Sequence, residues 1–281
     1  MLKALKFVFT ALLLLCSAVC LAQDGKADEQ LVRQLMLKSG LSKQIEQFPA
    51  TMETDIVSAN QEAGNMMSQS ELDDLIRMAL EAFNADTMNA IVQKHIQQNL
   101  KERDIRAVLK WLNSSLGKRI SKLEEEASRP EAYKKIQAMA GEIDKKRTRA
   151  ALLAKLDDAV KATDVGVSIS TNIQVAFILA LTAGMPADQR PSVDEILSEV
   201  NKDSEQLRTT IRKETLAGFM YAYRSLKDAE IKRYIAFAES KSGKRYHAIA
   251  AEGLNHAVLQ ASLALGSKLS RSMDKEGRDS F

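Results

Sequence analysis

The chain has 281 residues, with 40 Lys and Arg against 37 Asp and Glu, so its formal net charge at pH 7 is only +3. This balance gives no whole-protein attraction to nucleic acid or to an anionic membrane, so we expect neither a nucleic-acid partner nor a charge-driven membrane contact. Aromatic residues make up 5% of the chain and there are four prolines, a composition that favours helices over sheets.

Residues 1–22 have the order of a secretory signal peptide. Lys3 and Lys6 precede an apolar run over 7–15, and smaller residues end the segment at Ala22. We expect cleavage there, a mature chain that begins at about Gln23, and a periplasmic or secreted location. A retained anchor is disfavoured because the apolar run is short for a hydrocarbon core of about 30 Å.

Both cysteines, Cys16 and Cys20, lie inside this segment. A lipoprotein is the alternative interpretation, but a lipid-accepting cysteine needs a small residue before it, and Leu15 and Val19 stand there. A chain cleaved after Ala22 contains no cysteine. It can therefore form no disulfide, thiol nucleophile or thiolate metal site, and its stability must come from core packing.

Hydrophobic residues recur at helical spacing after the signal segment. One such stripe, at intervals of three and four, comprises Leu72, Leu75, Ile76, Ala79, Leu80 and Phe83. A Ser-x-x-Glu pattern begins at Ser68, Ser128 and Ser192, and each predicts a capping box at a helix start. No sustained run alternates like a strand, so the predicted class is all-α.

A shift of 126 positions aligns two segments of the chain. Residues 100–119 read LKERDIRAVLKWLNSSLGKR, and residues 226–245 read LKDAEIKRYIAFAESKSGKR. Seven of these 20 positions are identical, against about one expected by chance. We therefore predict a helical bundle of two related tandem repeats, over 23–129 and 130–270, joined near Arg129-Pro130.

Each copy predicts a helix, a sharp break and a second helix. A serine caps the second helix, and a glycine three residues later allows a close backbone approach at the bend. We expect the aromatic residue of each copy to be a buried anchor of its half. The motif residues, expected to be mainly structural, are Ile105, Trp111, Ser114, Gly117, Lys118, Ile231, Phe237, Ser240, Gly243 and Lys244.

The Gly-Lys pairs of this motif do not make a nucleotide loop. GxxxxGK[ST] needs a hydroxyl residue after the lysine, but Arg119 and Arg245 follow here. A weaker alternative is an anion site, formed by the helix start at Ser114 or Ser240 with the basic residues beside it.

No charged residue occurs between Asp164 and Asp188. The continuously apolar part, about Val175 to Leu181, is too short to span a bilayer. We expect it to be the central, buried helix of the second half and not a membrane segment. The polar residues 271–281 lack a stripe, and we expect this tail to be disordered.

The repeated segment resembles the bacterial exported family named domain of unknown function 2059. The resemblance is carried best by Asp228, Glu230, Ile231, Phe237, Ser240, Gly243 and Lys244, and the first copy matches with Trp111 in the aromatic place. The family often shows a proline two places before the glycine, where this chain has Ser115 and Lys241. The resemblance implies an exported helical protein and carries no catalytic residues, cofactor or established activity.

The sequence contains no recognisable catalytic or metal-binding motif. His95, His247 and His256 lack the spacing of a metal motif, and they are expected to be surface or half-buried helix residues. The acidic run Glu124 to Glu126 is expected to be a solvated face. We predict no catalytic residue, cofactor or metal. The expected function is a non-catalytic role in protein interaction or envelope structure with an unknown envelope protein, and the alternative is a carrier or sensor of an apolar or amphipathic ligand.

Overall fold

The computed structural model describes residues 27–62, 64–182, 185, 189, 191–202 and 204–279. Over these residues the secondary structure is helical without a strand, which confirms the all-α class. The predicted signal peptide and its cleavage point lie outside the described residues.

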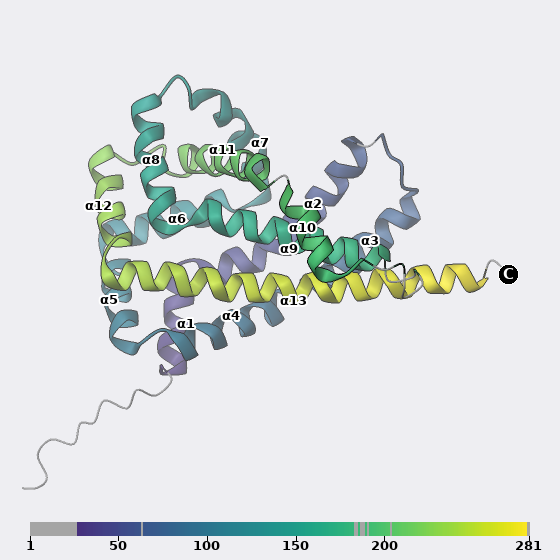
Figure 1. The fold of residues 1–281 in the computed structure, drawn as a ribbon. Coiled ribbons are helices and arrows are strands. Elements are labelled where there is room, and N and C mark those ends of the chain that lie inside the picture. The colour runs from purple at the N-terminus through teal and green to yellow at the C-terminus, as the bar shows by residue number, and fades with distance from the viewer. Residues whose placement is uncertain are drawn as a thin grey trace, which may run out of the picture.

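Two series of six helices follow one another along the chain (Figure 1). The first comprises α1 (Glu29–Lys38), α2 (Leu41–Glu62), α3 (Gln69–Ala82), α4 (Ala85–Asn99), α5 (Glu102–Leu112) and α6 (Ser115–Ala127). The second comprises α8 (Arg147–Val160), α9 (Ala162–Thr182), α10 (Val193–Lys202), α11 (Ser204–Ala222), α12 (Asp228–Ala238) and α13 (Lys241–Asp279). Two 3-10 turns, Pro130–Ala132 and Ala140–Glu142, flank the short α7 (Tyr133–Met139) between the series.

Local capping explains several helix starts. The Ser68 hydroxyl accepts from the amide of Glu71, whose carboxylate accepts in turn from the amide of Ser68. Ser192 and Glu195 form the same reciprocal pair before α10. The capping box predicted at Ser128 is wrong. Ser128 ends α6, because its hydroxyl donates to the carbonyl of Glu124 and the nearby Pro130 disfavours α-helical backbone at the residue before it.

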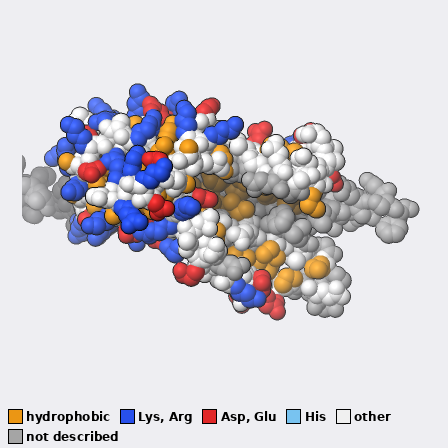
Figure 2. Space-filling view, turned by 90° about the horizontal axis from the view of Figure 1, so that it is seen from above, with side chains coloured by type: hydrophobic (Ala, Val, Ile, Leu, Met, Phe, Trp, Pro, Cys, Tyr) orange, Lys and Arg blue, Asp and Glu red, His pale blue; other side chains and the backbone are white. Residues whose placement is uncertain are grey.

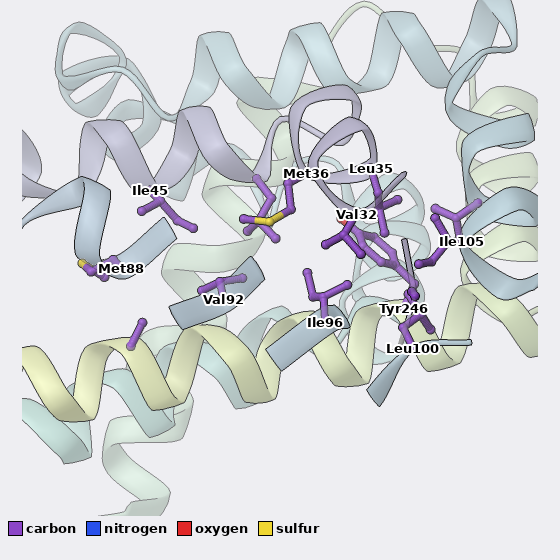
Figure 3. Packing of buried hydrophobic residues seen from close by; sticks show 14 of the residues in the cluster. Val32, Leu35, Met36, Ile45, Met88, Val92, Ile96, Leu100, Ile105 and Tyr246 are labelled. Carbon is purple, nitrogen blue, oxygen red and sulfur yellow. The ribbon is translucent and has the colours of Figure 1, made fainter. Parts of the chain in front are cut away.

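The two series share their cores. One hydrophobic cluster joins α1, α2, α4 and α5 to Tyr246, Ala257 and Val258 of α13 (Figure 3). The other joins Leu116 and Ile120 of α6 to residues of α8, α11 and α12. Each series therefore places its last helix in the core of the other, and 23–129 and 130–270 have no separate cores.

The uncharged stretch lies in α9 as far as Thr182, and α9 packs against α13, α11 and α10. Val175 is buried, but Ile178 and Leu179 are half-buried and Gln174 is exposed. Among the described side chains of the apolar part, burial is therefore confirmed at Val175 and is only partial at Ile178 and Leu179. None of the described helices combines the length and apolarity needed to cross a membrane.

The surface differs between the two ends of the molecule. Figure 2 shows lysine, arginine and acidic side chains over the broader end, and hydrophobic side chains in a hollow toward the end where α3 and α10 lie in Figure 1. The tail predicted to be disordered continues α13 as far as Asp279. At the start of this segment Arg271 donates to Ser267, and the hydroxyl of Ser272 donates to the carbonyl of Leu269.

Candidate functional site

A cavity of about 380 Å³ lies where the two series meet, and we call it the central cavity. Residues from α2, α5, α6, α7, α8, α9, α11, α12 and α13 border it. Its volume falls within the range of small-molecule sites. Aromatic side chains are prominent in its wall, namely Trp111, Phe219, Tyr223, Tyr234, Phe237, Tyr246 and His247.

The helix breaks hold two of these rings in place. Ser114 caps α6 by accepting from the amide of Gly117 at 3.0 Å, and Ser240 caps α13 by accepting from the amide of Gly243 at 3.1 Å. A Cβ atom on Gly117 would clash with the carbonyl oxygen of Trp111, and one on Gly243 with that of Phe237. Glycine is therefore required at both bends because the backbone that follows comes back onto the aromatic residue.

Trp111 and Phe237 stack on each other across the interface of the two series. Their ring centroids are 4.7 Å apart and their planes differ by 7°. Both side chains are half-buried, so the prediction of full burial is wrong. The reason is their position on the wall of the central cavity, which leaves part of each ring uncovered.

Two ion pairs flank this stack in a reciprocal arrangement. Arg119 of α6 donates to Glu230 of α12 at 3.0 Å, and Arg245 of α13 donates to Asp104 of α5 at 2.8 Å. In the predicted repeat, Arg119 matches Arg245 and Asp104 matches Glu230. In each series, an acidic, an aromatic and a basic residue at matching positions of the repeat therefore contact the other series.

Asp104 is the most deeply buried of these charged groups. Burial opposes its ionisation, but hydrogen bonds from Arg245 and Ser242 outweigh it and hold the pKa of the carboxyl group below its usual value. The pair therefore fixes the start of α13 against α5.

The remaining motif residues, two isoleucines and two lysines, differ in their exposure to solvent. Ile105 and Ile231 are fully buried, whereas Lys118 and Lys244 are exposed. For the anion-site alternative, both serines cap helices and both arginines pair with carboxylates, which leaves the exposed Lys118 and Lys244 as its basic residues.

Glu124 of α6 brings an ionisable group to the cavity wall. The hydroxyl groups of Tyr223 and Tyr234 both donate to its Oε1 atom, at 2.6 and 3.0 Å. Burial raises the pKa of Glu124 to about 7, although both tyrosine hydrogen bonds act to lower it. The carboxyl group is therefore poised to change its charge near neutral pH.

His247 of α13 supplies a second polar group to the same wall. Its Nε2 atom is buried and has no hydrogen-bond partner. Burial lowers the pKa of His247 to about 4, so the ring is neutral at physiological pH. An unpaired buried nitrogen is unfavourable for the folded state.

The sequence interpretation missed Glu124 and treated it as part of a solvated acidic run. The available indication was its spacing, since Glu124 lies four residues after Ile120 and eight after Leu116 on the buried stripe of α6. Nothing in the sequence shows that Tyr223 and Tyr234, from other helices, meet this carboxyl group.

Comparison with known proteins gives no relative. No protein-family model matches the chain, and neither a curated protein nor a solved structure matches it. The resemblance to domain of unknown function 2059 therefore stays a prediction. Within the described part of the chain, no group of three or more His, Cys, Asp or Glu side chains is placed to hold a metal ion.

Proposed function

We propose that this protein is an exported, non-catalytic carrier or sensor that binds one small amphipathic molecule in the central cavity. The observation that carries the proposal is a cavity of ligand size that is lined by aromatic rings and by the carboxyl group of Glu124. Export rests on the order of charged, apolar and small residues over 1–22.

The arrangement of polar groups favours binding over catalysis. Glu124 accepts from two tyrosines, and His247 has no hydroxyl partner at Nε2 in the described structure. A nucleophile activated by a neighbouring base is therefore not assembled at this wall. An envelope-interaction role stays the second candidate, favoured by the half-buried apolar side chains of α9.

A cavity-filling substitution tests the proposal. Gly218 borders the central cavity, and a Cβ atom added to it would meet nothing within 4 Å. We expect Gly218→Leu to occupy the space a ligand needs. Gly141 is exposed and equally open around its Cβ position, so Gly141→Leu is the matched control.

Native mass spectrometry of the three proteins purified from their own cells measures the outcome. The wild type and Gly141→Leu should carry the same non-covalent mass, and Gly218→Leu should lack it. An added mass in none of the proteins, or the same mass in all three, would overturn ligand binding in this cavity.

We also infer that the two six-helix series arose by duplication. The matched order of their helices and the reciprocal contacts around Trp111 and Phe237 support this inference. On this view the chain is an internal dimer, and the central cavity lies at the interface of its two halves.

A further inference from the structure

Over the described residues, the central cavity is bordered by an acidic side chain but by no basic one. Among the described residues that border it, Glu124 is the one carboxyl group, and none is a lysine or arginine. The other ionisable groups that border the cavity are Tyr223, Tyr234, Tyr246 and His247. All four are neutral near pH 7, because burial raises the tyrosine pKa values and lowers that of His247. An ionised Glu124 therefore has no cation beside it.

Aromatic rings border the same space. Trp111, Tyr234 and Phe237 are nearly parallel, with planes within 18° of one another and centroids 4.7 to 6.4 Å apart. Tyr223 stands edge-on to Tyr234, at 81° and 6.2 Å. The face of an aromatic ring carries negative electrostatic potential and attracts a cation. The rings and the carboxyl group thus favour the same sign of ligand charge.

We propose that the central cavity binds a small organic amine with a single positive charge. Its ammonium group pairs with the Glu124 carboxylate, and its apolar body packs among Trp111, Phe219 and Phe237. Both tyrosine hydrogen bonds go to Oε1, so Oε2 is the atom open to the ammonium group. This ligand class rests on the proposed function, since it assumes that the cavity is a binding site.

Charge explains why an amine is favoured over an anion or a neutral molecule. A carboxylate ligand would bring a second negative charge beside Glu124, and like charges in a partly dry site repel strongly. A neutral ligand would leave Glu124 either unpaired or protonated. A bound ammonium group supplies the missing countercharge and favours the ionised form of the carboxyl group.

Three probes that differ only in their polar end test the ligand class. Isothermal titration calorimetry of the full mature protein at a pH of about 8 compares 4-phenylbutylamine, 4-phenylbutanol and 4-phenylbutanoate. We expect the amine to bind at least about ten-fold more tightly than the alcohol, and the carboxylate to bind weakest. The affinity for the amine should fall as the pH drops below about 7, because protonation of Glu124 then competes with binding.

Comparing Glu124→Gln with Glu126→Gln shows whether the preference for the amine depends on the carboxyl group in the cavity or on another acidic residue of α6. Glutamine keeps the shape of the side chain and an oxygen for the tyrosine hydroxyls, so Glu124→Gln should abolish the preference for the amine. Glu126 pairs with Lys122 and does not border the cavity, so Glu126→Gln should leave the preference unchanged.

The outcomes distinguish the ligand class from the proposed function. Equal affinities for the three probes, failure of the amine to bind, or an amine preference that survives Glu124→Gln would overturn the amine assignment. The cavity would still be a ligand site if a co-purifying mass is lost in Gly218→Leu. Loss of the amine preference in Glu124→Gln alone would support the assignment.

Discussion

Glu124 and His247 should make the stability of the fold depend on pH in opposite directions. Burial raises the pKa of Glu124 from 4.5 to about 7, so the folded protein keeps a proton that the unfolded chain has released. The stability contribution of Glu124 is therefore complete below pH 4.5 and declines as the pH rises to about 7. Burial lowers the pKa of His247 from 6.5 to about 4, so its contribution is present above pH 6.5 and is lost as the pH falls to about 4.

The pKa shifts of Glu124 and His247 should change the free energy of unfolding by similar amounts. At about 1.4 kcal/mol for each pKa unit, either shift corresponds to a change of about 3 kcal/mol in the free energy of unfolding. Between pH values of about 4.5 and 6.5 the opposing trends nearly cancel in the wild type. Glu124→Gln removes one of them while glutamine still accepts from Tyr223 and Tyr234. The variant and the wild type should be about equally stable near pH 4.5, and the variant more stable by up to about 3 kcal/mol above pH 7.

Urea unfolding followed by far-UV circular dichroism, at several pH values between about 4.5 and 8, measures this difference. His247→Gln should show the opposite trend, with its gain over the wild type confined to low pH. Glu126→Gln provides the control, and its difference from the wild type should not vary in this way. A stability difference between Glu124→Gln and the wild type that is the same at every pH would refute the reasoning, since it would mean that Glu124 titrates alike in both states.

Three further predictions concern the bends, the ion pairs and the single tryptophan. Gly117→Ala should destabilise the fold by about 1–3 kcal/mol or more in thermal or urea unfolding, because the added Cβ would clash with backbone atoms. Gly218→Ala is the control and should be neutral or stabilising by up to about 1 kcal/mol. Equal effects of the two substitutions would contradict the contacts at the bend. Arg119→Glu should lower the melting temperature, and adding Glu230→Arg should recover part of the loss; no recovery would exclude a direct pair. Acrylamide quenching of Trp111 should decrease when 4-phenylbutylamine is bound, and quenching that is unchanged at saturating ligand would place the ligand elsewhere.

The helical class and the helix–break–helix segments were predictable because they depend on local spacing. Ser114 and Gly117 meet within one turn, and their roles follow from capping and backbone space. The partnership of Glu124 with Tyr223 and Tyr234 was not predictable, since it joins residues 99 and 110 positions apart. Spacing places a residue on a face of its own helix, but it does not identify the helix that covers this face.

The same limit applies to α9 and α13. An uncharged stretch predicts contact with apolar neighbours, but the half-buried state of Ile178 depends on how far the surrounding helices reach. α13 continues beyond Arg271 to Asp279 although these residues have no apolar stripe that would predict a helix. The repeat also does not predict that α6 and α13 each pack in the core of the other series. Two repeats that pack side by side, each with its own core, would show the same sequence pattern.

The exchange of last helices sets the order in which the protein can mature. The core around Val32 and Ile96 needs Tyr246 and Val258 of α13, which are synthesised only after α5 to α12. The first helices therefore cannot complete their core before α13 has been made. Contacts that close so large a loop form slowly, so the nascent chain keeps hydrophobic surface open until α13 arrives. Such a chain has a long period in which a chaperone can hold it, and a truncation before α13 removes part of the core of residues more than a hundred positions away.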